Sequence, residues 1–277
     1  MDKSKIAILS TVNNFLLYEK SSSLYPFKIQ SYVFDGRNGM FGIYSILYMM
    51  KIFKNKEIDW LVLMDEDALF IDSDLIYPII DKMKKDNYII AGVRDGGSLP
   101  ERSGSPYAMN PFFSIINFKE LKKIWNKKEM LKNHYINEDE FNDDLSTLKY
   151  PFNKMSMSEP YYCFYFWLKR KNQKMLYLEV DLPFDDDKIT NVVYDLNKKA
   201  ILYHTWFSRE YGDIRGRHTN RIDRVFNVFE NTNDSVTPNK IYKDSLFPLK
   251  NWFRRLKKNL LKRVMKTGFF SYKSNVV

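Results

Sequence analysis

The sequence predicts an α/β domain with a mostly parallel central sheet flanked by helices. The first observation is that short apolar segments of strand type alternate with segments of helical periodicity over the first hundred residues. The second is that charged and glycine-rich stretches follow the apolar segments at their carboxyl ends, where parallel sheets place their ligands. The third is composition, since 44% hydrophobic and 16% aromatic residues in a chain of 277 supply a large core.

The first half of the chain contains four predicted strands with helices between them. Apolar or alternating residues predict the strands, and charged residues or glycines bound them. Apolar residues at helical spacing, or an Asp-rich first turn, predict the helices. The strands are residues 5–11, 27–36, 58–67 and 88–97, and the helices are residues 40–53 and 73–86.

The second half is less regular. An apolar strand runs directly into an amphipathic helix, a second helix with Ser158 as its expected N-cap precedes a further strand, and a last strand carries His204. In that order, these segments are residues 110–125, 158–172, 174–180 and 200–207.

Basic charge is concentrated at the end of the chain. The net charge is +10, and residues 245–277 contain nine Lys or Arg and no acid, which leaves 35 basic and 34 acidic residues before them. This near-neutral main part argues against a nucleic-acid partner. The single cysteine, Cys163, excludes internal disulfides and is typical of a reducing compartment. We see neither a signal-peptide pattern nor the roughly 18 apolar residues of a membrane span.

Three consecutive acids, Asp65, Glu66 and Asp67, end the buried strand "DWLVLM". On a strand, residues two apart share a face, so Asp65 and Asp67 would lie about 6–7 Å apart with Glu66 on the other side. Two carboxylates at that spacing suit Mg²⁺ or Mn²⁺ when phosphate oxygens or water complete the shell. A solvated turn whose acids cap the next helix is the alternative.

The segment "LVLMDEDALF", after two strand–helix units, resembles the Asp-x-Asp motif of GT-A-type nucleotide-sugar glycosyltransferases of the bacterial surface-glycan type. The order of the remaining segments is also similar. "YAMNPFFSIINFKEL" resembles the segment that rebuilds the sheet beyond the metal, and "LYHTWF" resembles the segment with the late metal-binding histidine. The resemblance covers residues 5–215.

This resemblance implies a GT-A-like single domain that uses Mn²⁺ or Mg²⁺ and a nucleoside-diphosphate sugar. It implies that Asp65 touches ribose and water, that Asp67 binds the metal directly, and that His204 completes the metal site. A structural role is the alternative for His204. The nucleotide would be held where "STVNN" and the second strand end, at Thr11, Asn13 and Asp35.

A catalytic base is required only if the reaction inverts the sugar. Glu159 stands where inverting members of the family place that base, although Pro160 breaks the usual acidic pair. An acid that only complements the helix dipole is the alternative, and residues 138–140 are competing acids. Of the other histidines, His134 and His218 are expected at the surface.

Two glycine turns, "DGRNG" and "RDGGS", allow the backbone to approach a ligand closely. Arg37 and Arg94 in these turns are candidates to pair with phosphate, although ordinary turns explain them nearly as well. Arg209, Arg215 and Arg217 are candidates to close over the diphosphate.

The last segment predicts a basic amphipathic helix. Apolar residues form one stripe from Leu249 to Met265, with Lys and Arg on the other faces. Such a helix suits an anionic membrane surface, whereas a partner protein or the enzyme body are alternatives. The expected domains are residues 1–230 (catalytic), 231–244 (polar connector) and 245–277 (membrane-association tail).

The sequence therefore predicts a metal-dependent glycosyltransferase, cytoplasmic and peripheral at the inner face of the cell membrane. Its acceptor would be a glycan or lipid-linked acceptor in surface polysaccharide synthesis, such as lipopolysaccharide or capsule. A nucleotidyltransferase would need a glycine-rich, lysine-bearing loop after the first strand, which "STVNNFLLYEK" lacks. A non-catalytic membrane-surface binding protein is the remaining alternative.

Overall fold

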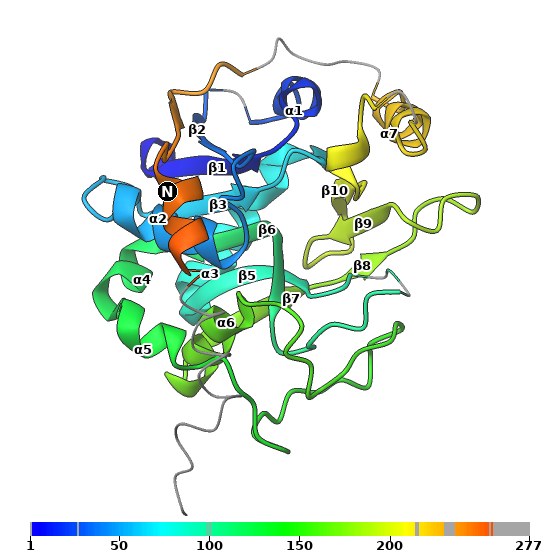
Figure 1. Ribbon diagram of the computed structural model, residues 1–277. Helices are drawn as coiled ribbons and strands as arrows, with labels where there is room; N and C mark the ends of the chain where they lie inside the picture. Colours follow the sequence, from blue (N-terminus) through cyan, green and yellow to red (C-terminus); the bar gives the residue numbers. More distant parts are fainter. Residues whose placement is uncertain are drawn as a thin grey trace, which may run out of the picture.

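A computed structural model describes residues 2–26, 28–97, 99, 101–213, 216–229, 236–254 and 256 of the chain. The described strands form a central seven-stranded sheet and a smaller four-stranded sheet (Figure 1). The central sheet contains, in spatial order, β11 (Lys240–Tyr242), β2 (Gln30–Asp35), β1 (Ile6–Val12), β3 (Trp60–Met64), β6 (Met109–Asn117), β5 (Tyr88–Arg94) and β7 (Lys174–Leu178). The smaller sheet contains β4 (Ala68–Phe70), β10 (Ala200–His204), β9 (Asn191–Tyr194) and β8 (Val180–Asp181).

Helices connect most of these strands and cover the central sheet. They are α1 (Phe15–Ser22), α2 (Ile43–Phe53), α3 (Ile76–Asp86), α4 (Phe118–Ile124), α5 (Lys127–Leu131), α6 (Tyr162–Arg170) and α7 (Thr219–Phe226). Short 3₁₀ turns are η1 (Lys3–Lys5), η2 (Ser73–Leu75) and η3 (Ser208–Glu210).

The central sheet is mostly parallel. Strands β11, β2, β1 and β3 run in one direction, and β7 is parallel to β5. Strand β6 is antiparallel to both of its neighbours, β3 and β5. The predicted fold class, an α/β domain with a mostly parallel central sheet flanked by helices, is confirmed.

The two faces of the sheet build two separate cores. Successive strand residues point to opposite faces, so Ala7 and Leu9 of β1 pack on one side while Ile6 and Ile8 pack on the other. The first side is covered by α2, α4, α5 and α6, and the second by α1, α3 and part of the smaller sheet. This arrangement explains why the parallel strands are apolar in nearly every position.

Helix α6 begins later than the sequence suggested. It starts at Tyr162, its N-cap residue Tyr161 makes no side-chain cap bond, and the prediction that Ser158 caps it is wrong. The residue before a proline is disfavoured in helical conformation, so Pro160 keeps Glu159 outside the helix. The Ser158 hydroxyl instead lies 3.2 Å from the Tyr162 hydroxyl.

The carboxyl-terminal part of the described chain joins the fold. Within the stretch predicted as a polar connector, β11 extends the central sheet beside β2. Residues 247–254 and 256 are helical, and Phe247 is buried against Tyr44 of α2. The rest of the predicted tail lies outside the described residues, and the proposed domain boundaries stay a prediction. Among the described helices, none combines the length and apolar character needed to cross a bilayer.

Candidate functional site

A cleft of about 430 Å³ opens at the carboxyl ends of β1 and β3. In parallel sheets this edge collects the residues that follow each strand, because the strands all end there. Thr11 and Asn13 come from the end of β1, Asp65 and Asp67 from the end of β3, and His204 from the end of β10. Five predicted site residues from three distant segments therefore line one cavity.

The acidic triplet lies in the turn that joins β3 to β4. The Ala68 amide donates to the Asp65 carbonyl over 3.2 Å, and the Asp65 amide donates to the Phe112 carbonyl of β6 over 2.8 Å. Because the chain turns here, strand alternation does not apply, and Glu66 lines the cleft together with Asp65 and Asp67. The expectation that Glu66 faces away from the two aspartates is therefore wrong.

Glu66 organises the loop after β1. Its side chain is 1% exposed, and its Oε1 accepts hydrogen bonds from the backbone amides of Asn13 over 3.0 Å and Asn14 over 3.1 Å. The Asn14 side chain in turn accepts from the Leu17 amide and caps α1. Two strand ends are thus tied together by one buried carboxylate.

The three carboxylates create an excess of negative charge in a desolvated place. Burial raises the pKa of Asp65 well above its usual range, and the charges of Glu66 and Asp67 raise it further, whereas the Arg209 guanidinium opposes the shift. Burial, followed by the charge of Asp67, raises the pKa of Glu66 to about 7. The hydrogen bonds that Glu66 accepts from backbone amides act in the opposite direction and lower its pKa. Like charges that cannot all ionise favour a nearby cation.

His204 lies at the rim of this acidic group. Its Nε2 is 3.6 Å from the Asp67 Oδ1, and its ring stacks on Phe112 at a centroid distance of 3.7 Å. Its Nδ1 is buried and has no hydrogen-bond partner among the described residues. An imidazole held flat beside a carboxylate is positioned either as a metal ligand or as a hydrogen-bond partner of bound phosphate.

The donor set fits a divalent cation that is held partly by its substrate. Carboxylate oxygens are the ligands that Mg²⁺ and Mn²⁺ prefer. Burial first, and then the neighbouring carboxylates, raise the pKa values of Asp65 and Glu66, so a bound cation would favour the ionised form of both groups. Within the described residues, no three His, Cys, Asp or Glu side chains converge as a ready-made metal cluster. A cation at Asp65 and Asp67 would therefore complete its shell with water or phosphate oxygens.

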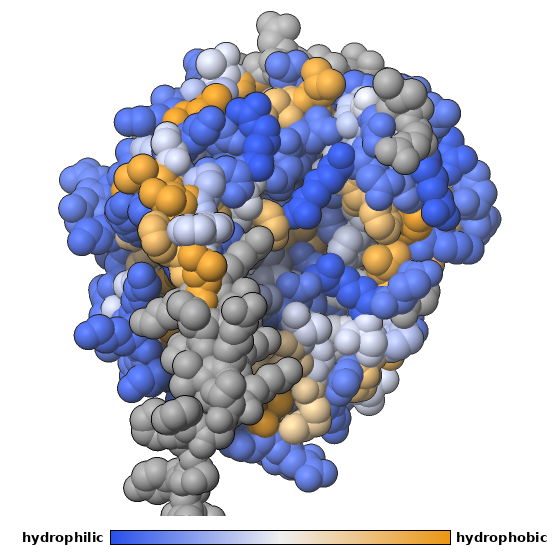
Figure 2. Space-filling model, viewed as in Figure 1, coloured by the Kyte–Doolittle hydropathy of each residue, from blue (hydrophilic) through white to orange (hydrophobic). Residues whose placement is uncertain are grey.

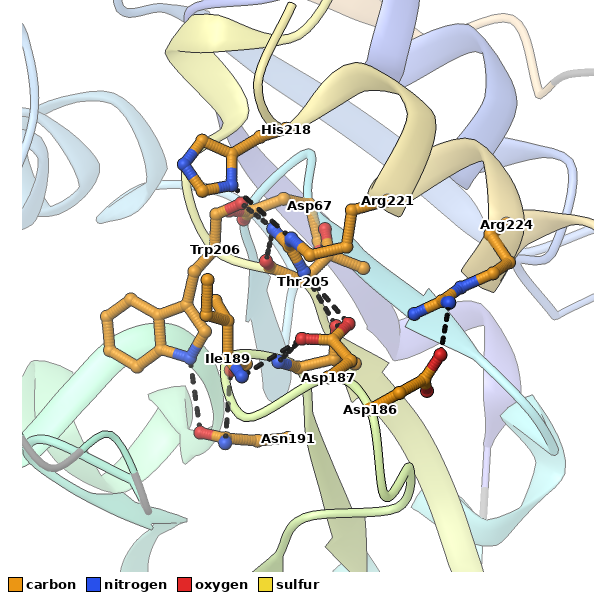
Figure 3. A network of polar contacts seen from close by, with 11 residues as sticks. Asp67, Asp186, Asp187, Ile189, Asn191, Thr205, Trp206, His218, Arg221 and Arg224 are labelled. Carbon is orange, nitrogen blue, oxygen red and sulfur yellow. Dashed lines mark hydrogen bonds and ion pairs between the residues drawn. The ribbon is translucent and has the colours of Figure 1, made fainter.

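A partly buried arginine fixes the loop that follows His204 (Figure 3). Arg221 of α7 donates from Nη2 to the carbonyl of Thr205 and, over 3.2 Å, to that of Trp206. Its Nη1 lies 3.3 Å from the Asp187 Oδ2 and donates to the Thr190 hydroxyl over 2.7 Å. The Thr205 amide donates back to the Asp67 carbonyl over 2.9 Å, so the clamp reaches the acidic turn.

The clamped loop is strained. Trp206 and Phe207 have φ angles of 57° and 61°, a left-handed conformation that costs about 1–2 kcal/mol for a residue with a side chain. The Trp206 indole donates to the Asn191 side chain over 3.1 Å, and its ring lies 4.2 Å from that of His204. Trp206 also lines the cleft, so the strain holds an aromatic wall beside the acidic group.

The cleft also contains a second polar cluster, next to Trp206, whose ring lies 5.4 Å from the Arg102 guanidinium. Arg102 donates from Nη2 to Glu159 over 3.0 Å and lies 3.4 Å from the buried Asp95. Asp95 also accepts from the hydroxyls of Tyr161 and Tyr162 and from the Asn110 amide. Burial raises the pKa of Glu159, while the Arg102 charge opposes the shift. This cluster connects three segments of the chain by hydrogen bonds, and it also presents the Glu159 carboxylate to the cleft.

Three predicted binding residues do not line the cleft. Asp35 and Arg37 pair with each other through two hydrogen bonds of 2.9 and 2.7 Å, and this pairing lowers the pKa of Asp35. Arg94 is buried and lines a different cavity, 3.5 Å from Asp143 and 3.5 Å from the centre of the Tyr177 ring. Each of these guanidinium groups is already matched by a carboxylate of the protein.

The two remaining histidines differ from each other. His134 is exposed, as expected. His218 is 6% exposed and stacks on Phe207 at 4.3 Å, so the expectation that it lies at the surface is wrong. Burial and the neighbouring Arg221 lower the pKa of His218.

Several cleft residues had no strong signal in the sequence. Asn110 is the exception, because a single amide inside the apolar segment "YAMNPFF" needs a partner when buried. Arg102 and Trp206 lie in irregular loops, and nothing local marks them as cleft residues. Arg209 was a candidate by position, and it lines the cleft with its guanidinium 4.4 Å from the Phe41 ring.

Comparison with known proteins gives distant likenesses only. No protein-family model and no curated protein matches the sequence. Among solved structures the chain is similar to A197 from STIV (TM-score 0.39, 11% identity, 72% of this chain and 93% of that chain covered). It is also similar to a mutant of LgtC (0.32, 13%, 46% and 62%) and to mouse xyloside xylosyltransferase 1 (0.28, 12%, 43% and 68%). TM-scores below 0.5 decide neither the family nor the activity of this chain.

Proposed function

We propose that the chain is a glycosyltransferase that uses a nucleoside-diphosphate sugar and a divalent cation, Mn²⁺ or Mg²⁺. The observation that carries the proposal is the acidic turn, with Asp65 and Asp67 facing a cleft at the carboxyl ends of β1 and β3. Crowded carboxylates are costly unless a cation joins them, and a diphosphate is the ligand that would share that cation. When bound, the cation would stabilise the negative charge that grows on the departing diphosphate.

The residues around the cleft suit separate tasks in that reaction. Asp65 and Asp67 would hold the cation, and His204, flat against Phe112, would contribute either a third ligand or a hydrogen bond to phosphate. Arg209 lines the cleft and acts electrostatically on Asp65, so it is suited to a phosphate oxygen at the entrance. Thr11 and Asn13 line the end where the nucleoside would lie.

The glycosyl acceptor would enter the cleft near Glu159. In an inverting reaction this carboxylate would accept the proton of the attacking hydroxyl, and its raised pKa brings it closer to the range of an effective base. The hydrogen bond from Arg102 orients the carboxylate but also weakens it as a base. In a retaining reaction no such base is required.

The nucleotidyltransferase alternative loses support from the loop after β1. That reaction would need backbone amides of this loop to cradle phosphates. The amides of Asn13 and Asn14 instead donate to Glu66. A phosphate could take these amides only by displacing a buried carboxylate.

The finer parts of the proposal concern the acceptor and the place of action. A glycan or lipid-linked acceptor in surface polysaccharide synthesis, lipopolysaccharide or capsule, would agree with a cytoplasmic enzyme at the inner face of the cell membrane. The basic composition of residues 245–277 supports that location, since cationic segments are attracted to anionic lipid. Most of this tail lies outside the described residues.

A thermal-shift screen tests the proposal. The chain would be mixed with UDP, GDP, ADP, CDP and dTDP, each with Mn²⁺, with Mg²⁺ or with EDTA. We expect one nucleotide to raise Tm by several degrees in the presence of metal only, because ligand at about 100 times its Kd stabilises by about 2.7 kcal/mol. The corresponding nucleotide sugars would then be assayed for release of the diphosphate.

A negative result would be equally clear. If no nucleotide stabilises the chain with metal, and no nucleotide sugar is turned over, the transferase proposal is wrong. The acidic turn would then be a structural tie, and a non-catalytic surface-binding protein would be the better description.

A further inference from the structure

A second cavity, of about 460 Å³, lies on the outer side of α2 and is here called the α2 groove. Its apolar lining comes from α2, from the loop before it, from the residue that follows α4, and from the carboxyl-terminal helical segment. The main contributors are Tyr44, Leu47, Met50, Trp125 and Phe247. The cleft uses different residues of the same helix, Ser45, Ile46 and Met49. Only the width of one helix, about 10 Å, therefore separates the groove from the cleft.

Cations surround the α2 groove. Lys51, Lys54, Lys127, Lys250 and Arg254 line it, and Asp244 is the one acid among its lining residues. The Asp244 carboxylate is already bound by Lys250 over 2.9 Å. Among the described residues, the other four cations have no ion pair with a carboxylate, and Arg254 rests on the Tyr44 ring at 5.1 Å. Unmatched positive charge around an apolar cavity is complementary to an anion with an apolar body.

Apolar side chains continue outward from the groove along the carboxyl-terminal helical segment. Leu249, Trp252 and Phe253 are 53%, 53% and 57% exposed. Figure 2 shows apolar residues gathered over this segment, with hydrophilic residues beside them. A soluble monomer gains nothing by exposing two adjacent large aromatic side chains, whereas the interfacial layer of a membrane accommodates them.

The chain's own last residues are a poor occupant for the groove. Residues 257–277 contain six Lys or Arg and no acid. A basic segment in a groove with a basic rim would bring like charges together, which costs free energy. Charge therefore favours an external anionic partner.

We propose that the α2 groove, together with Leu249, Trp252 and Phe253, is the site at which the folded body docks on an anionic phospholipid surface. Lys51, Lys54, Lys127 and Arg254 would contact lipid phosphates, while the aromatic side chains enter the interface. The inference deepens the membrane part of the proposed function, but it needs no particular reaction. Docking there would place a lipid-linked acceptor one helix away from the cleft.

Vesicle sedimentation of the full-length chain tests this inference. The vesicles would be phosphatidylcholine with or without phosphatidylglycerol, and the variant would be Lys51→Gln/Lys54→Gln/Lys127→Gln. Each surface cation contributes about 1 kcal/mol to binding anionic lipid, so we expect the loss of three to lower affinity for the anionic vesicles about 150-fold. The matched control, Lys84→Gln/Lys85→Gln/Lys188→Gln, removes three exposed lysines elsewhere and should bind within about twofold of the unaltered chain.

Three results would overturn the inference. Unchanged binding by the groove variant would assign lipid binding to residues beyond 256. An equal loss in the control variant would mean that net charge alone matters, and no binding to anionic vesicles would exclude this partner. Release of diphosphate in solution, measured on the same variants, keeps the inference separate from the transferase proposal, because none of the three lysines lines the cleft.

Discussion

At the scale of single residues, the acidic turn is expected to lower the stability of the metal-free chain and to favour binding of a cation. Asp67 raises the pKa of both Asp65 and Glu66, so its charge is unfavourable toward these two carboxylates in the metal-free protein, and this outweighs its weaker attraction to Arg221 in our expectation. We expect Asp67→Asn to stabilise the metal-free chain by about 1–2 kcal/mol, because a close like charge is removed while the shape is kept. This corresponds to roughly 2–8 °C in Tm, measured by thermal unfolding in EDTA.

Metal and nucleotide together should make the unaltered chain more stable than Asp67→Asn. The unaltered chain should gain Tm on addition of Mn²⁺ and nucleotide, whereas Asp67→Asn should gain little and lose turnover. Asp81→Asn, an exposed change on α3, is the control and should behave like the unaltered chain. If Asp67→Asn lowers Tm in EDTA, the turn is stabilised by that carboxylate and the electrostatic account fails.

Glu159 allows the stereochemical course to be tested. Glu159→Gln keeps the size of the side chain and an oxygen that can accept from Arg102, but removes the base. We expect transfer to fall at least about 100-fold with donor affinity unchanged, as for loss of a general base. Initial rates of transfer and nucleotide titrations would measure this, with a change at an exposed acid, Glu101→Gln, as control. Transfer that survives Glu159→Gln would remove this residue from the chemistry and favour retention.

At the scale of elements, α7 acts on the cleft without lining it. The Arg221 side chain is 12% exposed and its partner Asp187 is 1% exposed, whereas Arg224 on the same helix is 54% exposed and its partner Asp186 is 70% exposed (Figure 3). Lysine cannot reproduce the several fixed donors of a guanidinium. We therefore expect Arg221→Lys to destabilise the chain by about 2–3 kcal/mol and Arg224→Lys by less than about 0.5 kcal/mol.

The functional consequence concerns the strained loop. Once Trp206 and Phe207 are no longer held at positive φ, the loop can relax, and His204 loses its fixed neighbour. Metal-dependent nucleotide affinity should then weaken in Arg221→Lys and remain normal in Arg224→Lys, as measured by titration well below the Tm of each variant. Equal affinities in the two variants would limit Arg221 to a role in stability.

Local pattern predicts the parallel strands well, because buried parallel strands are apolar runs bounded by polar turns. The convergence of strand ends in such sheets also predicted Asp65 and Asp67 at one edge, but it predicted Asp35 and Arg94 there too, and these two do not line the cleft. His204 was expected at the site from the resemblance of "LYHTWF", not from local pattern. Local pattern failed for elements whose position depends on pairing with distant segments of the chain. Nothing near residues 68–70 or 200–204 marks them as antiparallel neighbours, and the Arg221 clamp depends on segments that meet only in the folded chain. Glu66 was misjudged because a turn was taken for a strand.

At the scale of the whole molecule, the two cores share one sheet, so the domain is expected to unfold as a unit. Cys163 reports on this process. It lies in α6 within the core beside α2, it is 2% exposed, and burial raises its pKa to about 11. At pH 8 the folded chain would hold roughly 200-fold less thiolate than an unfolded one. Labelling by iodoacetamide should therefore be slow in the native state and fast in denaturant.

Labelling of Cys163 also tests whether ligand in the cleft stabilises the core. Glu159 and Tyr161 line the cleft immediately before α6, and Met49 lines it from α2, so ligand in the cleft would contact α2 and the segment that leads into α6. If labelling requires global unfolding, metal and nucleotide at about 100 times Kd should slow it about 100-fold. Asp67→Asn should cancel this protection, because it removes the metal site and leaves the core unchanged. If protection persists in Asp67→Asn, nucleotide binds without the acidic turn. If ligand does not change the labelling of the unaltered chain, α6 opens locally.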